Sequence, residues 1–144
     1  MANEDTRRLL GECDAGIKMA VGSIDEVLSA VEDPKLLDAL RASKRAHEYL
    51  GGQTQELLTR YDAGSKSPNA MAKSMSWLKT NMKLVMSPGD QSVADLMTDG
   101  CSMGVKSLHR YCNRYAGASA DTIQLADRLI GEEERLMRDL QSYL

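Results

Sequence analysis

Two side chains that could do chemistry, Glu133 and His47, stand at positions where a helical pattern would ordinarily place leucine. Read in alternating steps of three and four residues, the last helical segment gives the series Ile123, Ala126, Ile130, Glu133, Met137, Leu140 and Leu144. An earlier segment read in the same way gives Leu36, Leu40, Ser43, His47, Leu50, Thr54, Leu57 and Tyr61. A bundle that buries a carboxylate and an imidazole must satisfy them with a metal, with each other or with another charge.

The composition is typical of a single helical domain. The chain has 144 residues, no Phe and three Pro, and it is rich in residues that favour helices. Its three cysteines, Cys13, Cys101 and Cys112, show no paired spacing, so we expect reduced thiols in a cytoplasmic protein. No run approaches the roughly eighteen apolar residues of a membrane span, and the acidic start lacks a signal core.

Five helical segments are predicted within one domain that covers residues 1–144. Four long helices are expected at about 4–31, 34–62, 91–116 and 119–143, with a shorter crossing helix at about 68–86. Short links join the first two long helices into one antiparallel hairpin and the last two into a second.

Caps and prolines mark where these helices begin. Asp33-Pro34 and Ser67-Pro68 each combine a capping residue with a proline suited to the first turn. Asp90 and Ser119 are the expected caps of the third and fourth long helices.

The crossing helix decides the topology. A helix of about 17 residues spans ~26 Å, which is long enough to carry the chain back along the bundle. The second and third long helices then run parallel. The prediction is therefore an all-α, ferritin-like four-helix bundle with an extra short helix crossing between them.

Eight of the eleven glycines fall inside predicted helices, where each costs about 1 kcal/mol relative to Ala. They include Gly16, Gly100 and Gly104. One interpretation is that they allow helices to approach closely, for example where the crossing helix would lie over Gly100 and Gly104. The other is a small cavity or kink near the middle of the bundle.

Four stretches of the chain resemble the ferritin-like superfamily. They are Cys13-Asp14-Ala15-Gly16-Ile17, Glu32-Asp33-Pro34, Met75-Ser76-Trp77-Leu78-Lys79 and Asp95-Leu96-Met97-Thr98-Asp99-Gly100. The chain is most similar to small bacterial domains of unknown function in which a short Trp-containing helix bridges two helix pairs. The resemblance covers essentially the whole chain and implies a fold rather than an activity, because these families include many members without a known reaction.

The resemblance also implies a di-metal centre, which places one Glu on each of two helices and a Glu-x-x-His on each of the other two. This chain keeps His47 and Glu133, but the matching partner positions hold Lys44 and Leu136. The central turns of the other two helices contain no acid. Two ligands of six are too few for a hard or borderline cation, so we expect no metal, no cofactor and vestigial ligand positions at His47 and Glu133.

The same replacements suggest a buried polar cluster of Lys44, His47 and Glu133. Helix ends near Asp33 and Gly117 place His47 and Glu133 at similar depth in the bundle. Lys44 would supply the charge of the missing metal and pair with Glu133, while His47 forms a hydrogen bond nearby. The alternative is that Lys44 and His47 lie at the groove edge and reach water.

The other reactive residue types have simpler interpretations. His109 lies one residue off its apolar seam and is predicted at the surface, and Cys13 and Cys101 are expected to act as small core residues. The two histidines lie on different helices with no serine or cysteine placed beside either. The sequence therefore gives no support for a hydrolase triad.

The crossing helix is the expected partner surface. Residues 63–89 hold four lysines and no acid, although the chain as a whole has a net charge of −3. The acidic total argues against nucleic acid as a partner. A Met-rich face with basic flanks suits a protein or membrane surface, while the alternative is that its methionines pack on the bundle. The predicted surface is Met71, Met75, Trp77, Met82, Lys73, Lys79 and Lys83.

The expected function is a non-catalytic, metal-free binding or structural module. Trp77 lies beside the methionine stripe, so a second subunit, and hence a homodimer, is one expected partner. The alternative function is a metal-binding or oxidoreductase-type protein with a reduced site at His47 and Glu133. Peripheral membrane association through the crossing helix is a third.

Overall fold

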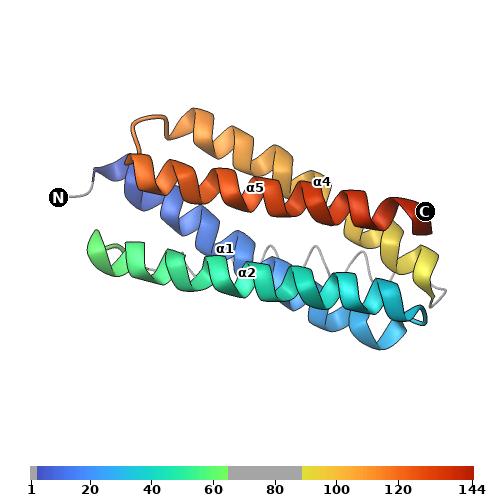
Figure 1. The fold of residues 1–144 in the computed structure, drawn as a ribbon. Helices are drawn as coiled ribbons and strands as arrows, with labels where there is room; N and C mark the ends of the chain where they lie inside the picture. The colour runs from blue at the N-terminus through green and yellow to red at the C-terminus, as the bar shows by residue number, and fades with distance from the viewer. Residues whose placement is uncertain (1–2, 65–88) are drawn as a thin grey trace.

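The computed structural model describes residues 3–64 and 89–144, and within these ranges it is helical and has no strand (Figure 1). The long helices are α1 (Glu4–Val27), α2 (Pro34–Arg60), α4 (Asp90–Arg114) and α5 (Ala120–Leu140). Single 3-10 turns, η1 (Leu28–Ala30) and η2 (Gln141–Tyr143), extend α1 and α5. The four long ranges expected from the sequence agree with these elements to within a few residues.

The predicted crossing helix at about 68–86 lies outside the described residues. The same holds for the partner surface that was placed on it, which consists of Met71, Met75, Trp77, Met82, Lys73, Lys79 and Lys83.

The start of α2 follows the cap-and-proline prediction. Asp33 is the N-cap, and its carboxylate accepts a hydrogen bond of 2.7 Å from the backbone N–H of Lys35, with Pro34 in the first turn. This arrangement satisfies one of the backbone donors that a helix leaves unpaired at its beginning.

Asp90 has a different role from the predicted cap. It is the first residue of α4, and Gly89 occupies the cap position. The Asp90 carboxylate accepts hydrogen bonds from the backbone N–H groups of Glu32, at 2.7 Å, and Asp33, at 3.1 Å. It therefore ties the beginning of α4 to the link between α1 and α2.

The four helices pack side by side as a bundle. α1 packs on α2, α4 packs on α5, and the two pairs meet through α2 with α5 and α1 with α4. Followed from blue to red in Figure 1, α2 and α4 run in one direction along the bundle and α1 and α5 in the other. The members of each pair are therefore antiparallel, as the short links predict.

The apolar core forms two clusters, one toward each end of the bundle. The first includes Leu10, Leu57, Leu125 and Leu129, together with the aromatic ring of Tyr115. The second includes Ile24, Leu36, Leu40, Met97 and Leu140. The two residues singled out in the sequence, His47 and Glu133, belong to neither cluster and lie in the chain between residues of the two.

Candidate functional site

His47 and Glu133 meet in the middle of the bundle. His47 is 0% exposed on α2 and Glu133 is 8% exposed on α5, so both are buried as their places in the apolar series predict. Nε2 of the imidazole lies 2.8 Å from Oε1 of the carboxylate. Of the three ways to satisfy such groups, the structure shows the one in which they pair with each other.

The second ring nitrogen fixes the tautomer of His47. Nδ1 lies 2.8 Å from the backbone carbonyl oxygen of Ser43, one turn earlier on α2. A carbonyl can only accept, so Nδ1 must carry a proton and donate it. One further proton is shared between Nε2 and Glu133. When Nε2 carries it, the pair is an imidazolium and a carboxylate.

The surroundings favour this charged form of His47. Burial lowers the pKa of His47, but the hydrogen bond and negative charge of Glu133, with the Ser43 carbonyl, outweigh it. The pKa of His47 therefore lies above its usual value. The result is a buried ion pair that links α2 to α5 at mid-bundle.

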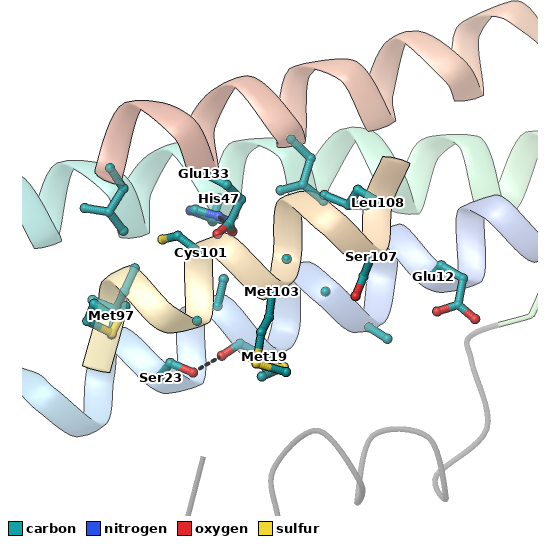
Figure 2. Close-up of a pocket in the computed structure, with 18 of the residues that line it drawn as sticks. Glu12, Met19, Ser23, His47, Met97, Cys101, Met103, Ser107, Leu108 and Glu133 are labelled. Atoms are coloured by element: carbon teal, nitrogen blue, oxygen red, sulfur yellow. Dashed lines mark hydrogen bonds and ion pairs between the residues drawn. The ribbon is translucent and has the colours of Figure 1, made fainter. Parts of the chain in front are cut away.

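Gly104 and Cys101 on α4 border the other side of the Glu133 carboxylate. A Cβ at Gly104 would lie 3.3 Å from Oε2 of Glu133, so the glycine provides the space that this oxygen occupies. The negative charge of Glu133 also contributes to the raised pKa of the nearby Cys101 thiol, after burial. Figure 2 shows His47, Glu133 and Cys101 gathered beside α4.

The predicted ion pair between Lys44 and Glu133 is wrong. Nζ of Lys44 lies 2.7 Å from Oδ1 of Asp25 on α1, and its side chain is 31% exposed. Lys44 lies one turn before His47 on a partly exposed side of α2, where its long side chain reaches α1. The groove-edge alternative therefore describes Lys44, whereas His47 is fully buried.

A cavity of about 310 Å³ lies beside the ion pair, and His47 and Glu133 both line it. Small residues create much of this space where α1 faces α4. They are Ala15, Gly16 and Ala20 on α1 and Gly100 and Gly104 on α4. The three glycines named from the sequence, Gly16, Gly100 and Gly104, thus lie at a mid-bundle cavity, which was one of their two interpretations.

The rest of the described lining is mainly apolar. Met19, Met97, Met103 and Leu108 line the cavity (Figure 2). Leu129 lines it as well. Few polar side chains join them, namely Glu12, Ser23, Ser107 and Tyr111 in addition to the ion pair. Sequence periodicity could not find this site, because its lining comes from helices far apart in the chain and includes residues off the apolar seams.

The remaining candidates lie elsewhere or are unreactive. His109 is exposed on α4, as predicted, and Cys13 and Cys101 are buried, as expected for core residues. Burial first, and then the charge of Glu133, raise the pKa of the Cys101 thiol far above its ordinary value. The thiol beside the ion pair is therefore protonated at neutral pH.

The described residues do not fit the di-metal centre that the ferritin-like resemblance implies. Both ring nitrogens of His47 are already engaged, with Ser43 and with Glu133. Within the described ranges, no group of three His, Cys, Asp or Glu side chains is arranged to hold a metal ion. A metal site of this kind needs at least one more donor than the pair supplies.

Comparison with known proteins returned no match among protein-family models, curated proteins or solved structures. In the part of the chain that the structure describes, none of the helices combines the length and apolar character that crossing a membrane requires.

Proposed function

We propose that this chain is a non-catalytic binding module, a metal-free helical bundle whose ligand occupies the cavity between α1 and α4. The observation that carries the proposal is the cavity itself, which has a largely apolar lining and a buried ion pair at its side. Its volume of about 310 Å³ lies at the lower end of the roughly 300–1,000 Å³ that small-molecule sites span.

Small residues support a binding role over a purely structural one. A bundle selected for stability alone would fill the space between α1 and α4, because an unfilled cavity destabilises a core. At Gly16 an added Cβ would find its nearest neighbour, Leu129 Cδ2, 4.0 Å away, so the site accepts a Cβ without a clash.

The chemistry of the site favours binding over catalysis. A general acid or base needs a group free to exchange a proton with a substrate, and a cysteine nucleophile needs the thiolate. His47 has both nitrogens engaged within the protein, and Cys101 is held as the thiol. The His47–Glu133 pair instead gives the mainly apolar cavity one fixed polar contact.

The ferritin-like arrangement with an extra crossing helix forms part of the proposal. The four sequence stretches that resemble that superfamily support it, and so does the shared direction of α2 and α4 (Figure 1). With this shared direction, the end of α2 and the beginning of α4 lie at opposite ends of the bundle, as in a bundle with one long crossover connection.

A fluorescent apolar probe tests the binding function. N-phenyl-1-naphthylamine, which brightens in apolar surroundings, should bind the wild-type chain saturably at one site. Gly16→Leu should weaken this binding by at least tenfold, because the leucine fills the cavity from α1. Gly131→Leu is the matched control, since Gly131 lies on α5, is exposed, and has nothing within 4 Å of an added Cβ.

Two results would contradict the proposal. One is equal probe binding by the Gly16→Leu and Gly131→Leu variants, with both folded by circular dichroism. The other is stoichiometric iron, manganese or zinc in protein purified without a His tag, lost on His47→Ala, which would favour the metal-binding alternative.

The proposal keeps two expectations from the sequence, a cytoplasmic location and a homodimer. The buried, protonated thiols of Cys13 and Cys101 are compatible with a reducing compartment. Light scattering on a gel-filtration column gives the molar mass of the assembly, and a mass near 15.8 kDa would rule out the dimer.

A further inference from the structure

The cavity between α1 and α4 is elongated along the helices. Its described lining runs from Glu12 to Ile24 on α1, which is ~18 Å of helix, and from Leu96 to Tyr111 on α4, which is ~22 Å. A sphere with the same volume of about 310 Å³ would be only ~8 Å across, less than half of the ~18 Å covered on α1. The free space is therefore thin in relation to its length, and a thin ligand suits it better than a wide one.

One end of the cavity is apolar. Because α1 and α4 run in opposite directions, the end of the lining on α1 lies beside the beginning of the lining on α4 (Figure 1). The residues there belong to the second apolar cluster and are each 5% exposed or less, namely Ile24, Leu96, Met97 and Leu136. Ser23 also lines this end, but its hydroxyl donates to the backbone carbonyl of Met19, at 2.7 Å. The polar side chains of Ser107 and Glu12 lie toward the opposite end (Figure 2).

The middle of the cavity has a polar contact that is already satisfied. Both ring nitrogens of His47 have partners, and Glu133 is one of them, so methylene groups that pass beside the pair break none of its hydrogen bonds. Met19 from α1 and Met103 from α4 line the same part of the cavity (Figure 2). Their unbranched, polarisable side chains adapt to the surface of an apolar ligand.

We infer that the ligand of this cavity carries a single unbranched alkyl chain, with its methyl end at Ile24 and Leu96 and its polar head toward Ser107. This inference rests on the proposed binding function and names its ligand class by shape. A methylene group fills a little less than the ~30 Å³ of a water molecule in the liquid, so a cavity of about 310 Å³ holds a chain of about ten carbons.

A series of uncharged alcohols tests the length of the chain. The alcohols 1-hexanol, 1-octanol, 1-decanol and 1-dodecanol each compete with bound N-phenyl-1-naphthylamine, whose flat aromatic groups suit the same thin space. Affinity should rise by roughly fourfold for each added methylene up to decanol, because each one leaves water for the cavity. From decanol to dodecanol it should rise by less than twofold, since the additional carbons find no further space.

Cyclododecanol tests the width of the site. It has one hydroxyl group and is about as hydrophobic as decanol, but its carbons form a wide ring. It should displace the probe only at a concentration at least tenfold higher than decanol does.

Two matched variants test the direction of the chain. Ser23→Leu adds a leucine at the apolar end, so the affinity should stop rising at a chain at least two carbons shorter than in the wild type. Ser107→Leu adds the same side chain toward the other end and should leave that chain length unchanged. Circular dichroism checks that both variants fold.

The outcomes separate this inference from the binding function. Equal displacement by decanol and cyclododecanol, or affinities that do not depend on chain length, would overturn the alkyl-chain inference and leave the binding function standing. A shorter limit in Ser107→Leu but not in Ser23→Leu would overturn the direction of the chain. If neither the probe nor any alcohol binds the wild type, the binding function itself fails. The wild-type series decides the inference even where Ser23→Leu does not fold.

Discussion

Two carboxylates on α5, Glu133 and Asp121, both link that helix to α2, and their surroundings differ. Asp121 lies near the start of α5 with its side chain 34% exposed, and both of its oxygens accept from Tyr61, at 2.9 and 3.0 Å. Arg60 and Ser119 add a 3.0 Å ion pair and a 2.6 Å hydrogen bond. Glu133 is buried and has one polar partner on α2, His47.

The comparison shows that Asp121 has a structural role, whereas Glu133 belongs to the candidate site. Asp121 accepts from donors at the end of α2 and at the N-cap of α5, so little of its acceptor capacity is left for anything else. Glu133 is buried, is paired with one imidazole and lines a cavity. Removing Glu133 should therefore lower the free energy of unfolding more than removing Asp121.

The largest effect is expected at the buried pair. Glu133→Leu leaves His47 without its partner and should lower the free energy of unfolding by about 3–5 kcal/mol. The double variant His47→Leu/Glu133→Leu should recover most of this loss, because two apolar side chains carry no desolvation penalty. Urea denaturation of the wild type, both single variants and the double variant measures the coupling. Strictly additive losses would show that the two side chains do not act as a pair.

The second prediction concerns pH. The pKa of His47 is raised in the folded state, so its contribution to stability is complete below the unfolded pKa of about 6.5 and is lost as pH rises through the folded pKa. Between those two values the loss should approach about 1.4 kcal/mol per pH unit. The stability difference between the wild type and the double leucine variant should therefore shrink as pH rises from neutral. A difference that is constant with pH would contradict the assigned charge state.

Asp121 should show a weaker effect with the opposite sign. Burial raises the pKa of Asp121, but hydrogen bonds from Ser119 and Tyr61 and the charge of Arg60 lower it overall. Its contribution is present above the unfolded pKa of about 3.9 and is lost as pH falls through the lower, folded pKa. Asp121→Asn at neutral pH should cost about 1 kcal/mol or less, since the group is partly exposed. If Asp121→Asn lowered the free energy of unfolding as much as Glu133→Leu, the two acids would not differ in energetic role.

The smallest effect is expected at Lys44. Its ion pair with Asp25 joins two partly exposed side chains, so Lys44→Met should change the melting temperature less than either leucine variant of the buried pair. The change should shrink further in concentrated salt, which screens exposed charges. If the effects of Lys44→Met and Glu133→Gln on stability were not additive, Lys44 would interact with Glu133 after all, which would contradict the observed geometry.

Periodicity in the sequence was sufficient to predict the four long helices and the burial of His47 and Glu133. An apolar series in steps of three and four identifies the face of a helix that turns inward, whatever single residue interrupts it. The partner of Glu133 could not be chosen in this way, because His47 and Lys44 are one turn apart on α2. A rotation of less than a right angle about the helix axis decides which of the two reaches α5 and which reaches Asp25 on α1.

The cavity was harder to predict for a different reason. Glycine and alanine in a helix have the same appearance in a sequence whether they allow close packing or leave a space. A Cβ at Gly104 would lie 3.3 Å from the Glu133 carboxylate, which is tighter than ordinary contact, whereas a Cβ at Gly16 would lie at an ordinary 4.0 Å from Leu129. Only the three-dimensional arrangement of α1, α4 and α5 distinguishes these two cases.

The central ion pair has a consequence for the alignment of the helices. Sliding α5 along α2 by one turn, about 5.4 Å, would remove Glu133 from the imidazole and set both groups against aliphatic side chains. An interface made only of leucines would tolerate such a shift, because each leucine would meet another leucine in the new position. The pair therefore marks a single axial register for the whole bundle, and with it the relative positions of the two cavity walls.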